Sequence, residues 1–256
     1  MKLTEYDDER SAILNPDIFV KRLPECPKIF VTCFAKNLVE YAVNTYQGRI
    51  IGEWFCANGA FPIYELTFKN EKIGLIMSLV GAPSTVAEYE DLFAMGVENI
   101  LVFGTCGVLD RNISDCSVIV PNSAVRDEGT SFHYLPESDE ITVNLGLIDR
   151  MKDFLISKEI KYTVGKVWTT DALYRETRSK MLRRKNDGCI CVDMECSAIA
   201  AVASFRNKLV GQFFYAADNL DSDTYDVRSL SNGSRLDVKR KIIDLALEMA
   251  AEIFSN

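Results

Sequence analysis

The 256-residue sequence contains a single histidine, and none of its eight cysteines forms a CxxC pair. Structural metal sites need closely spaced cysteine and histidine ligands, so we expect no metal. The chain also lacks a hydrophobic run of the roughly 18 residues that a membrane-spanning helix requires. Its first residues, MKLTEYDDER, are charged and lack the apolar segment of a signal peptide. These absences predict a cytoplasmic protein with no membrane partner.

Positive charge is also scarce, because 29 lysines and arginines stand against 37 acidic residues, for a formal net charge of −8. Nucleic acids and membrane surfaces are polyanionic, so an acidic chain is a poor partner for either. Cysteine is the residue that is not scarce, and most of these side chains lie in apolar stretches. This pattern is typical of free, buried thiols in a reducing compartment.

Strand-like and helix-like segments alternate along the chain. Strands are expected at 28–34, 49–56, 62–69, 72–80, 99–103, 116–125, 162–170, 189–194 and 209–218. Helices are expected at 35–46, 83–96, 145–159, 176–186, 195–206 and 235–254. The hydrophobic content of 48% suffices for a large core, and no repeat or linker divides the chain. We therefore predict one α/β domain over residues 1–256, with a mixed central β-sheet flanked by helices.

Polar residues gather where four of these strands end, and ligands of α/β folds bind outside the carboxyl ends of strands. The stretch NILVFGTCGVLD predicts a strand followed by a turn at Gly104–Gly107, whose backbone N–H groups can cradle an anion. Glu195 stands where a strand becomes an almost wholly apolar helix, and it either caps that helix or has another partner. Asp218 ends an otherwise apolar strand and is equally compatible with a cap. The other strand end is Thr32–Lys36.

Taken together, these segments resemble the hexameric nucleoside phosphorylases, the group of uridine phosphorylase and bacterial-type purine nucleoside phosphorylase. GAPSTVAEYEDLFAMGVENILVFGTCGVLD is similar to the family's Gly-x-Pro-Ser helix and Gly-Ser/Thr-x-Gly loop. VDMECSAIAAVA resembles its Glu-Met-Glu signature, and RDEGTSFHYLP and GKVWTTDALYRET are similar to segments of uridine phosphorylases. The resemblance implies a pentosyltransferase that is a homo-oligomer, a dimer or a hexamer. Such an enzyme splits a nucleoside with phosphate into ribose 1-phosphate and a free base, without a metal or organic cofactor.

The resemblance also implies roles for the residues of the nucleoside site. Glu195 would hold the ribose hydroxyls, and its charge would favour the developing oxocarbenium ion. Met194 would pack on the sugar, although core packing is an equal alternative on sequence. Asp218 matches the aspartate with which purine-specific members meet N7 of the leaving base as a general acid. Uridine phosphorylases read uracil with a glutamine and an arginine; the glutamine is absent here, and Arg175 or Arg178 is left for a pyrimidine carbonyl or for the solvated surface.

The phosphate site departs from the family's pattern. Thr105 and Gly104 remain to offer a hydroxyl and N–H donors, but the three arginines expected around phosphate align with Lys36, Gly59 and Val102. Charge-assisted contacts are roughly twice as strong as neutral ones, so we expect weak phosphate binding. We expect an arginine at position 102 to tighten it if the side chain fits. Hydrolysis by water, or nucleoside binding without turnover, are the alternatives, and the sequence does not choose between purine and uracil.

The single histidine, His133, lies in the SFHY segment, where the uridine phosphorylase branch has a similar histidine. We do not count it among the catalytic candidates, because a lone histidine more often has a structural role.

Overall fold

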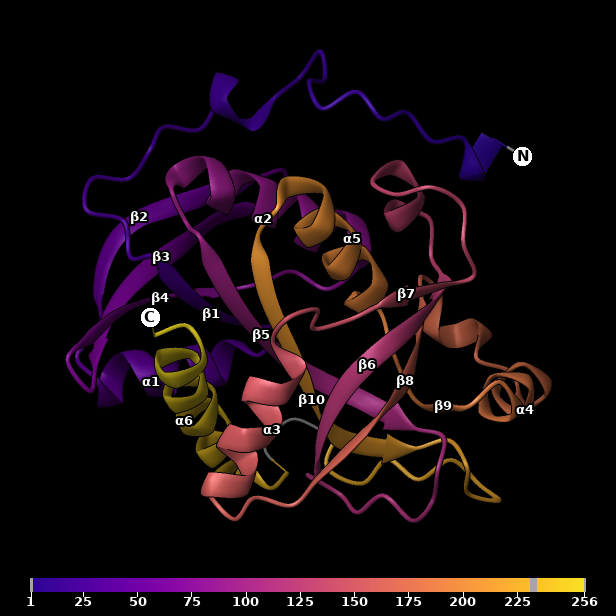
Figure 1. Cartoon of the computed structure of the whole chain (residues 1–256). Coiled ribbons are helices and arrows are strands. Elements are labelled where there is room, and N and C mark those ends of the chain that lie inside the picture. The colour runs from indigo at the N-terminus through magenta and orange to yellow at the C-terminus, as the bar shows by residue number, and fades with distance from the viewer. Residues whose placement is uncertain (1, 231–233, 256) are drawn as a thin grey trace.

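The computed structural model describes residues 2–230 and 234–255, and one ten-stranded sheet joins the strands in these ranges (Figure 1). The strands are β1 (Ile29–Cys33), β2 (Arg49–Cys56), β3 (Gly59–Phe68), β4 (Glu71–Met77), β5 (Asn99–Val108), β6 (Val118–Asp127), β7 (Glu140–Thr142), β8 (Tyr162–Thr170), β9 (Cys189–Asp193) and β10 (Leu209–Asn219). The helices are α1 (Lys36–Thr45), α2 (Ala82–Met95), α3 (Ile148–Ser157), α4 (Arg178–Asn186), α5 (Cys196–Arg206) and α6 (Leu236–Ile253). Short 3₁₀ turns are η1 (Lys2–Thr4), η2 (Pro16–Ile18), η3 (Thr130–His133) and η4 (Leu173–Arg175).

The sheet is mixed, as the sequence predicts. Strands β4, β1, β5 and β10 are parallel neighbours, and β3 and β2 extend the sheet beyond β4 in antiparallel pairing. Strand β10 also pairs antiparallel with β6, which leads through β8 and β9 back to β5. Five strands therefore form a closed ring, β5–β10–β6–β8–β9. This closure brings the last residues of β5, β9 and β10 together at one end of the ring.

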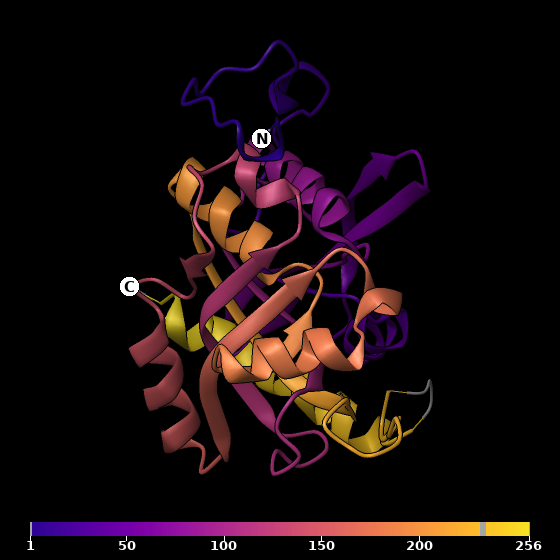
Figure 2. The ribbon, with the colours of Figure 1, turned by 90° about the vertical axis from the view of Figure 1, so that its right-hand side faces the viewer.

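Both faces of the sheet are covered by helices (Figures 1 and 2). Alternate residues of β1 enter different clusters: Val31 packs in the cluster that includes residues of α1, α3 and α6, whereas Phe30 packs with residues of α2 and α5. This alternation is what a strand buried on both faces requires. The N-terminal segment, residues 2–28, arches over the side of α2 and α5 (Figure 1). The prediction of a mixed sheet flanked by helices is confirmed.

One local prediction is wrong. The sequence predicts a turn at Gly104–Gly107, but β5 continues through these residues to Val108. The reason lies in the neighbouring strands, since β10 pairs with β5 as far as Val108, with a bulge between Ala216 and Asp218, and β9 pairs at Gly107. Small residues here serve close packing between strands rather than a reversal of the chain.

Candidate active site

Glu195 lies at the junction of β9 and α5. It occupies the N-cap position of α5, but its side chain makes no capping bond. Oε1 instead accepts a 2.6 Å hydrogen bond from the backbone N–H of Gly81, which is the N-cap residue of α2. The residue is 7% exposed, and burial, together with the nearby Asp193 carboxylate, raises the pKa of Glu195. A carboxyl group therefore sits where two helix N-termini, with their partial positive charge, come together.

The side chain that caps the start of α5 belongs to Asp193, two residues before Glu195. Its Oδ2 accepts from the backbone N–H groups of Glu195 and Cys196 at 2.9 and 2.7 Å, and its Oδ1 accepts from Thr169 Oγ1 at 2.7 Å. The sequence places Asp193 at a candidate strand end, but its capping role was not predicted, although an aspartate just before an apolar helix is the usual sign of a cap. Because Asp193 accepts hydrogen bonds from the N–H groups at the start of α5, the Glu195 side chain does not cap this helix. Between them, Met194 is only half-buried.

Asp218 faces Gly107 across the β5–β10 pairing. A Cβ on Gly107 would lie 3.2 Å from Asp218 Oδ1 and 2.5 Å from Leu220 Cδ1, so this approach requires glycine. Asp218 Oδ2 accepts a 3.1 Å hydrogen bond from the Tyr225 hydroxyl. The aspartate is 8% exposed, and burial raises its pKa. A raised pKa favours the protonated form that a general acid needs.

The loop that follows β8 brings a second carboxyl group toward Asp218. Arg175 is exposed on η4, while its neighbour Glu176 is half-buried. Burial and the charge of Asp218 raise the pKa of Glu176 to about 7. Arg178 Nη1 donates to the carbonyl of Ser222 at 2.8 Å, which ties this loop to the one after β10. Sequence reasoning passed over Glu176, and its only signal is an acid within an otherwise basic run.

Gly104, Thr105 and Lys36 line one cavity of about 620 Å³ at the ends of β1 and β5. Thr105 is exposed, and Lys36 lies 3.7 Å from Glu40 with 77% of its side chain exposed. The other lining residues are Cys33, Phe34, Ala35, Asn37, Glu40, Met77, Phe103, Tyr215, Leu230 and Lys239. The structure thus brings the three sequence candidates for an anion site together.

Lys239 of α6 is the lining residue that sequence reasoning missed. It is 7% exposed, and its Nζ donates to the carbonyl of Ser229 at 2.6 Å. With Ile242, Ile243 and Ala246 it falls on the i, i+3, i+4, i+7 stripe that α6 buries. A lysine on an apolar stripe is the signal that could have found it.

Positions 102 and 59, where the family pattern has arginines, place no charged side chain at this cavity. Val102 is 3% exposed and packs with Phe30 and Tyr89 in the core on the α2 side of the sheet, so position 102 has no room for an arginine without repacking. Gly59 is exposed at the start of β3 with φ +127° and open space around it. Phe34 fills part of the site, since its ring carbon Cδ2 is 3.0 Å from where a Cβ on Gly104 would stand.

A buried acid lies behind the cavity wall formed by Cys33 and Met77. Glu88 of α2 is fully buried, and Ser78 Oγ donates to its Oε1 at 2.9 Å. Among residues 2–230 and 234–255, nothing bonds its Oε2. Burial raises the pKa of Glu88 to about 8, which favours the neutral form of this carboxyl group.

The described ranges contain no group of three or more histidine, cysteine, aspartate or glutamate side chains that could hold a metal ion. All eight cysteines are free, and five of them are buried. No helix in the described part of the chain has both the length and the apolar character to cross a membrane.

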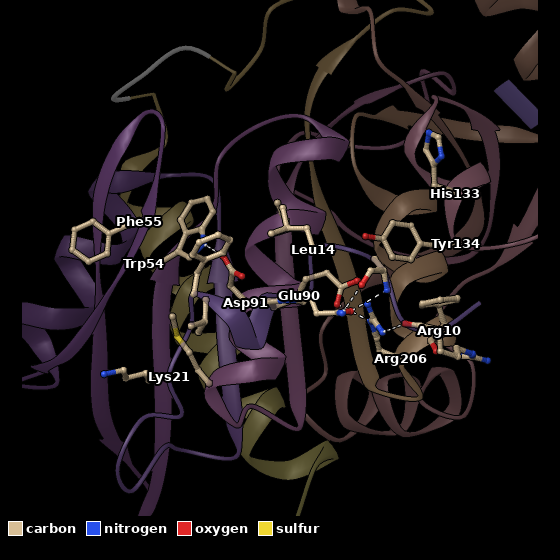
Figure 3. Close-up of a pocket in the computed structure, with 18 of the residues that line it drawn as sticks. Arg10, Leu14, Lys21, Trp54, Phe55, Glu90, Asp91, His133, Tyr134 and Arg206 are labelled. Carbon is tan, nitrogen blue, oxygen red and sulfur yellow. Dashed lines mark hydrogen bonds and ion pairs between the residues drawn. The ribbon is translucent and has the colours of Figure 1, made fainter. Parts of the chain in front are cut away.

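A second cavity, of about 860 Å³, lies beneath the N-terminal segment and is lined by none of the strand-end residues (Figure 3). Trp54 Nε1 donates to Asp91 at 2.8 Å, and Arg206 Nε donates to Glu90 at 2.7 Å. His133 is exposed on the wall of this cavity. The single histidine thus lies with the N-terminal segment in this cavity wall.

Comparison with known proteins places these residues in context. Residues 35–253 of the chain match the sequence-family model of the phosphorylase superfamily. A DeoD-type purine nucleoside phosphorylase from Bacillus cereus is 27% identical over 140 residues, which cover 54% of this chain and 60% of the relative, so the match spans less than two thirds of that relative's length. Two solved structures share the fold. Uridine phosphorylase from Vibrio fischeri has a TM-score of 0.74 at 21% identity, covering 95% of this chain and 97% of that one. AMP nucleosidase from Bacteroides thetaiotaomicron has a TM-score of 0.67 at 20% identity, covering 88% and 89%.

Proposed function

The chain belongs to the phosphorylase superfamily, and from this premise we propose that it cleaves the N-glycosidic bond of a nucleoside with phosphate. The products are ribose 1-phosphate and a free base. The observation that carries the proposal is Glu195, a buried acid at a helix start whose capping task is done by Asp193. A buried carboxyl group that does not cap its helix has the chemistry to bind vicinal hydroxyls.

In this proposal Glu195 accepts hydrogen bonds from two neighbouring ribose hydroxyls. The hydroxyls stabilise its ionised form, which opposes the effect of burial on its pKa. As the base departs, positive charge develops on the sugar ring, and the nearby carboxylate stabilises it. Met194, half-buried beside Glu195, packs against the sugar.

Asp218 is proposed as the acid that meets the leaving base. Its raised pKa supports this role, because a protonated carboxyl group can donate to N7 of a purine and leave the base neutral. Glu176 lies close enough to raise the cost of ionising both groups together. We therefore propose that purine nucleosides are cleaved at least as well as uridine, with Arg175 outside the base contacts because its side chain is exposed on η4.

Thr105 and Gly104 are proposed to hold phosphate, with Lys36 at the cavity entrance. The Thr105 hydroxyl and the backbone N–H groups donate to the oxyanion, which then approaches C1′ of the ribose. The absence of an arginine at positions 59 and 102 supports weak phosphate binding.

The second candidate function is hydrolysis of the same bond by water. The packing of Phe34 against Gly104 favours it, because an aromatic ring takes space and adds no donor where an anion would bind. The AMP nucleosidase named above has the same fold, and this likeness alone does not choose between the two reactions.

We also propose that the chain forms a homo-oligomer, a dimer or a hexamer. Large apolar side chains are exposed on the N-terminal segment and on β2, and a second copy would cover them: Ile13, Leu14, Ile18, Phe19, Ile50 and Phe55. Sedimentation velocity at micromolar concentration tests this proposal, and a stable monomer contradicts it.

The experiment that tests the reaction is a product assay over a panel of nucleosides, with and without phosphate. Phosphorolysis predicts that base release depends on phosphate and that ribose 1-phosphate accumulates. Free ribose at a rate independent of phosphate indicates the nucleosidase. Absence of cleavage in both conditions, with binding retained, leaves a nucleoside-binding protein.

A further inference from the structure

We propose that Lys239 binds phosphate in this site, supplying from α6 a positive charge that positions 59 and 102 lack. The inference rests on the proposed function, because it assigns a residue to the anion end of that site. It names a cation that lies far from the matched motifs in the sequence but lines the same cavity as Thr105 and Gly104.

Lys239 lines the cavity from a buried position, and its ammonium group donates to the carbonyl of Ser229. Lys239 is 7% exposed, whereas the Lys36 side chain is 77% exposed. A charge in a buried position is less screened by water and salt, so it attracts an anion more strongly than an exposed one. Lys239 is therefore the better placed of the two lysines to contribute binding free energy.

The neighbouring strands connect Lys239 to the phosphate candidates. Tyr215 of β10 is the register partner of Thr105 in β5, and both line the cavity with Lys239. The charge of Lys239 also acts on the Cys116 thiol, which lies just before β6, the other neighbour of β10. Lys239 thus stands against the strand next to Thr105.

The balance of charge in the cavity favours an anion. Among its described lining residues, the lysines at positions 36 and 239 outnumber the single acid, Glu40, whose carboxylate pairs with Lys36 at 3.7 Å. The Lys239 ammonium donates to Ser229 O at 2.6 Å, which holds the lysine against the segment that precedes α6. The ligand class is a phosphate group, either inorganic phosphate or the phosphate of ribose 1-phosphate.

The decisive variant is Lys239→Gln, which removes the charge but keeps a donor for the Ser229 carbonyl. We expect the KM for phosphate to rise at least tenfold while the KM for the nucleoside changes less than twofold. Lys239→Arg should restore most of the phosphate affinity because it keeps the charge. The matched control is Lys241→Gln, an exposed lysine on the same helix, which should leave both values unchanged.

A second measurement separates this inference from the proposed reaction. The melting temperature of each variant is titrated with inorganic phosphate alone, which needs no turnover. Phosphate should stabilise the wild type and Lys239→Arg at concentrations that leave Lys239→Gln unchanged. Equal stabilisation of wild type and Lys239→Gln, or no stabilisation of the wild type, overturns the inference. If the wild type binds phosphate through Lys239 but releases free ribose, the phosphorylase proposal fails while the assignment of Lys239 stands. If Lys239→Gln does not fold, the same comparison is made with Lys239→Met, judged by the same criteria.

Discussion

The two ends of the proposed site differ in charge and in their likeness to the family pattern that the sequence resembles, and Glu195, Asp218 and Glu176 do not line the cavity that holds Thr105. The nucleoside end is acidic, with Glu195, Asp218 and Glu176 buried or half-buried and two of them at strand ends that match the family resemblance. The anion end holds Lys36 and Lys239, and its sequence departs from that resemblance. The resemblance is therefore preserved where sugar and base would bind and altered where the nucleophile would bind.

This difference teaches that the two ends are free to change separately. Glu195 depends on Asp193 and on the start of α2, whereas Thr105 and Gly104 depend on β1, β10 and α6. A change in the residues proposed to hold phosphate would leave the supports of Glu195 intact.

The largest expected effect comes from forcing the anion end back to the family's pattern with Val102→Arg. Position 102 is 3% exposed in an apolar cluster, so the guanidinium would be buried without a partner. We expect a loss of about 3–5 kcal/mol in the free energy of unfolding, measured in urea. The control is Val80→Arg, where the side chain is 61% exposed and the cost should be small. Unchanged stability together with tighter phosphate binding would show that the position opens to the cavity.

The next largest effect is a loss of activity on substitution of Glu195 at the proposed nucleoside end. Glu195→Gln keeps an acceptor for the Gly81 N–H but loses the charge that stabilises the transition state. We expect kcat/KM to fall roughly 10²-fold, which is about 2.7 kcal/mol. The exposed Glu137→Gln serves as control, and a folded Glu195→Gln with near wild-type turnover would rule out this role for Glu195.

A smaller effect, on substitution of Asp218, tests whether the preferred base is a purine or uracil. Asp218→Asn removes the proton donor, so cleavage of inosine and adenosine should fall at least tenfold, about 1.4 kcal/mol, while uridine cleavage changes little. Asp223→Asn, an exposed aspartate in the following loop, is the control. Strong uridine cleavage with the purine nucleosides untouched in the wild type would contradict the purine assignment.

The last test concerns the pH dependence of stability and Glu88, which lies behind the proposed anion end. Its pKa is raised to about 8, so the folded protein holds this proton more tightly than the unfolded chain does. Its contribution to stability is therefore complete below about pH 4.5 and is lost as pH rises toward about 8, with a slope of up to about 1.4 kcal/mol per pH unit. Glu88→Gln should flatten that slope in urea melts taken across this range, and Glu137→Gln should not. A slope unchanged in Glu88→Gln would place the pH dependence in other groups.

Much of the fold could be predicted because local patterns decide it. The 3.6-residue periodicity locates α6 closely, and a nearly continuous apolar run locates β10, which is buried at every position after Leu209. The Gly104–Gly107 segment was predicted as a turn because small residues permit one, yet the pairing of β10 and β9 with β5 keeps it extended. A local sequence pattern cannot predict pairing with strands that are distant in the sequence.

The candidate site could be predicted only in part for the same reason. Glu195, Asp218 and Thr105 belong to ordered motifs, so resemblance finds them. Asp193 caps α5 through local bonds to the N–H groups of Glu195 and Cys196, whereas Lys239 reaches the cavity only through the packing of α6. Their signals, an aspartate before a helix and a lysine on an apolar stripe, are visible in the sequence but common in proteins of every function.

The hydrogen bond from Gly81 to Glu195 has a thermodynamic consequence for ligand binding. It fixes a long, flexible side chain in one rotamer in the empty protein. The conformational entropy of that side chain, about 1.5 kcal/mol, is given up on folding rather than when a sugar arrives. If Glu195 binds the sugar as proposed, the sugar meets a preorganised acceptor, and more of its contact energy appears as affinity.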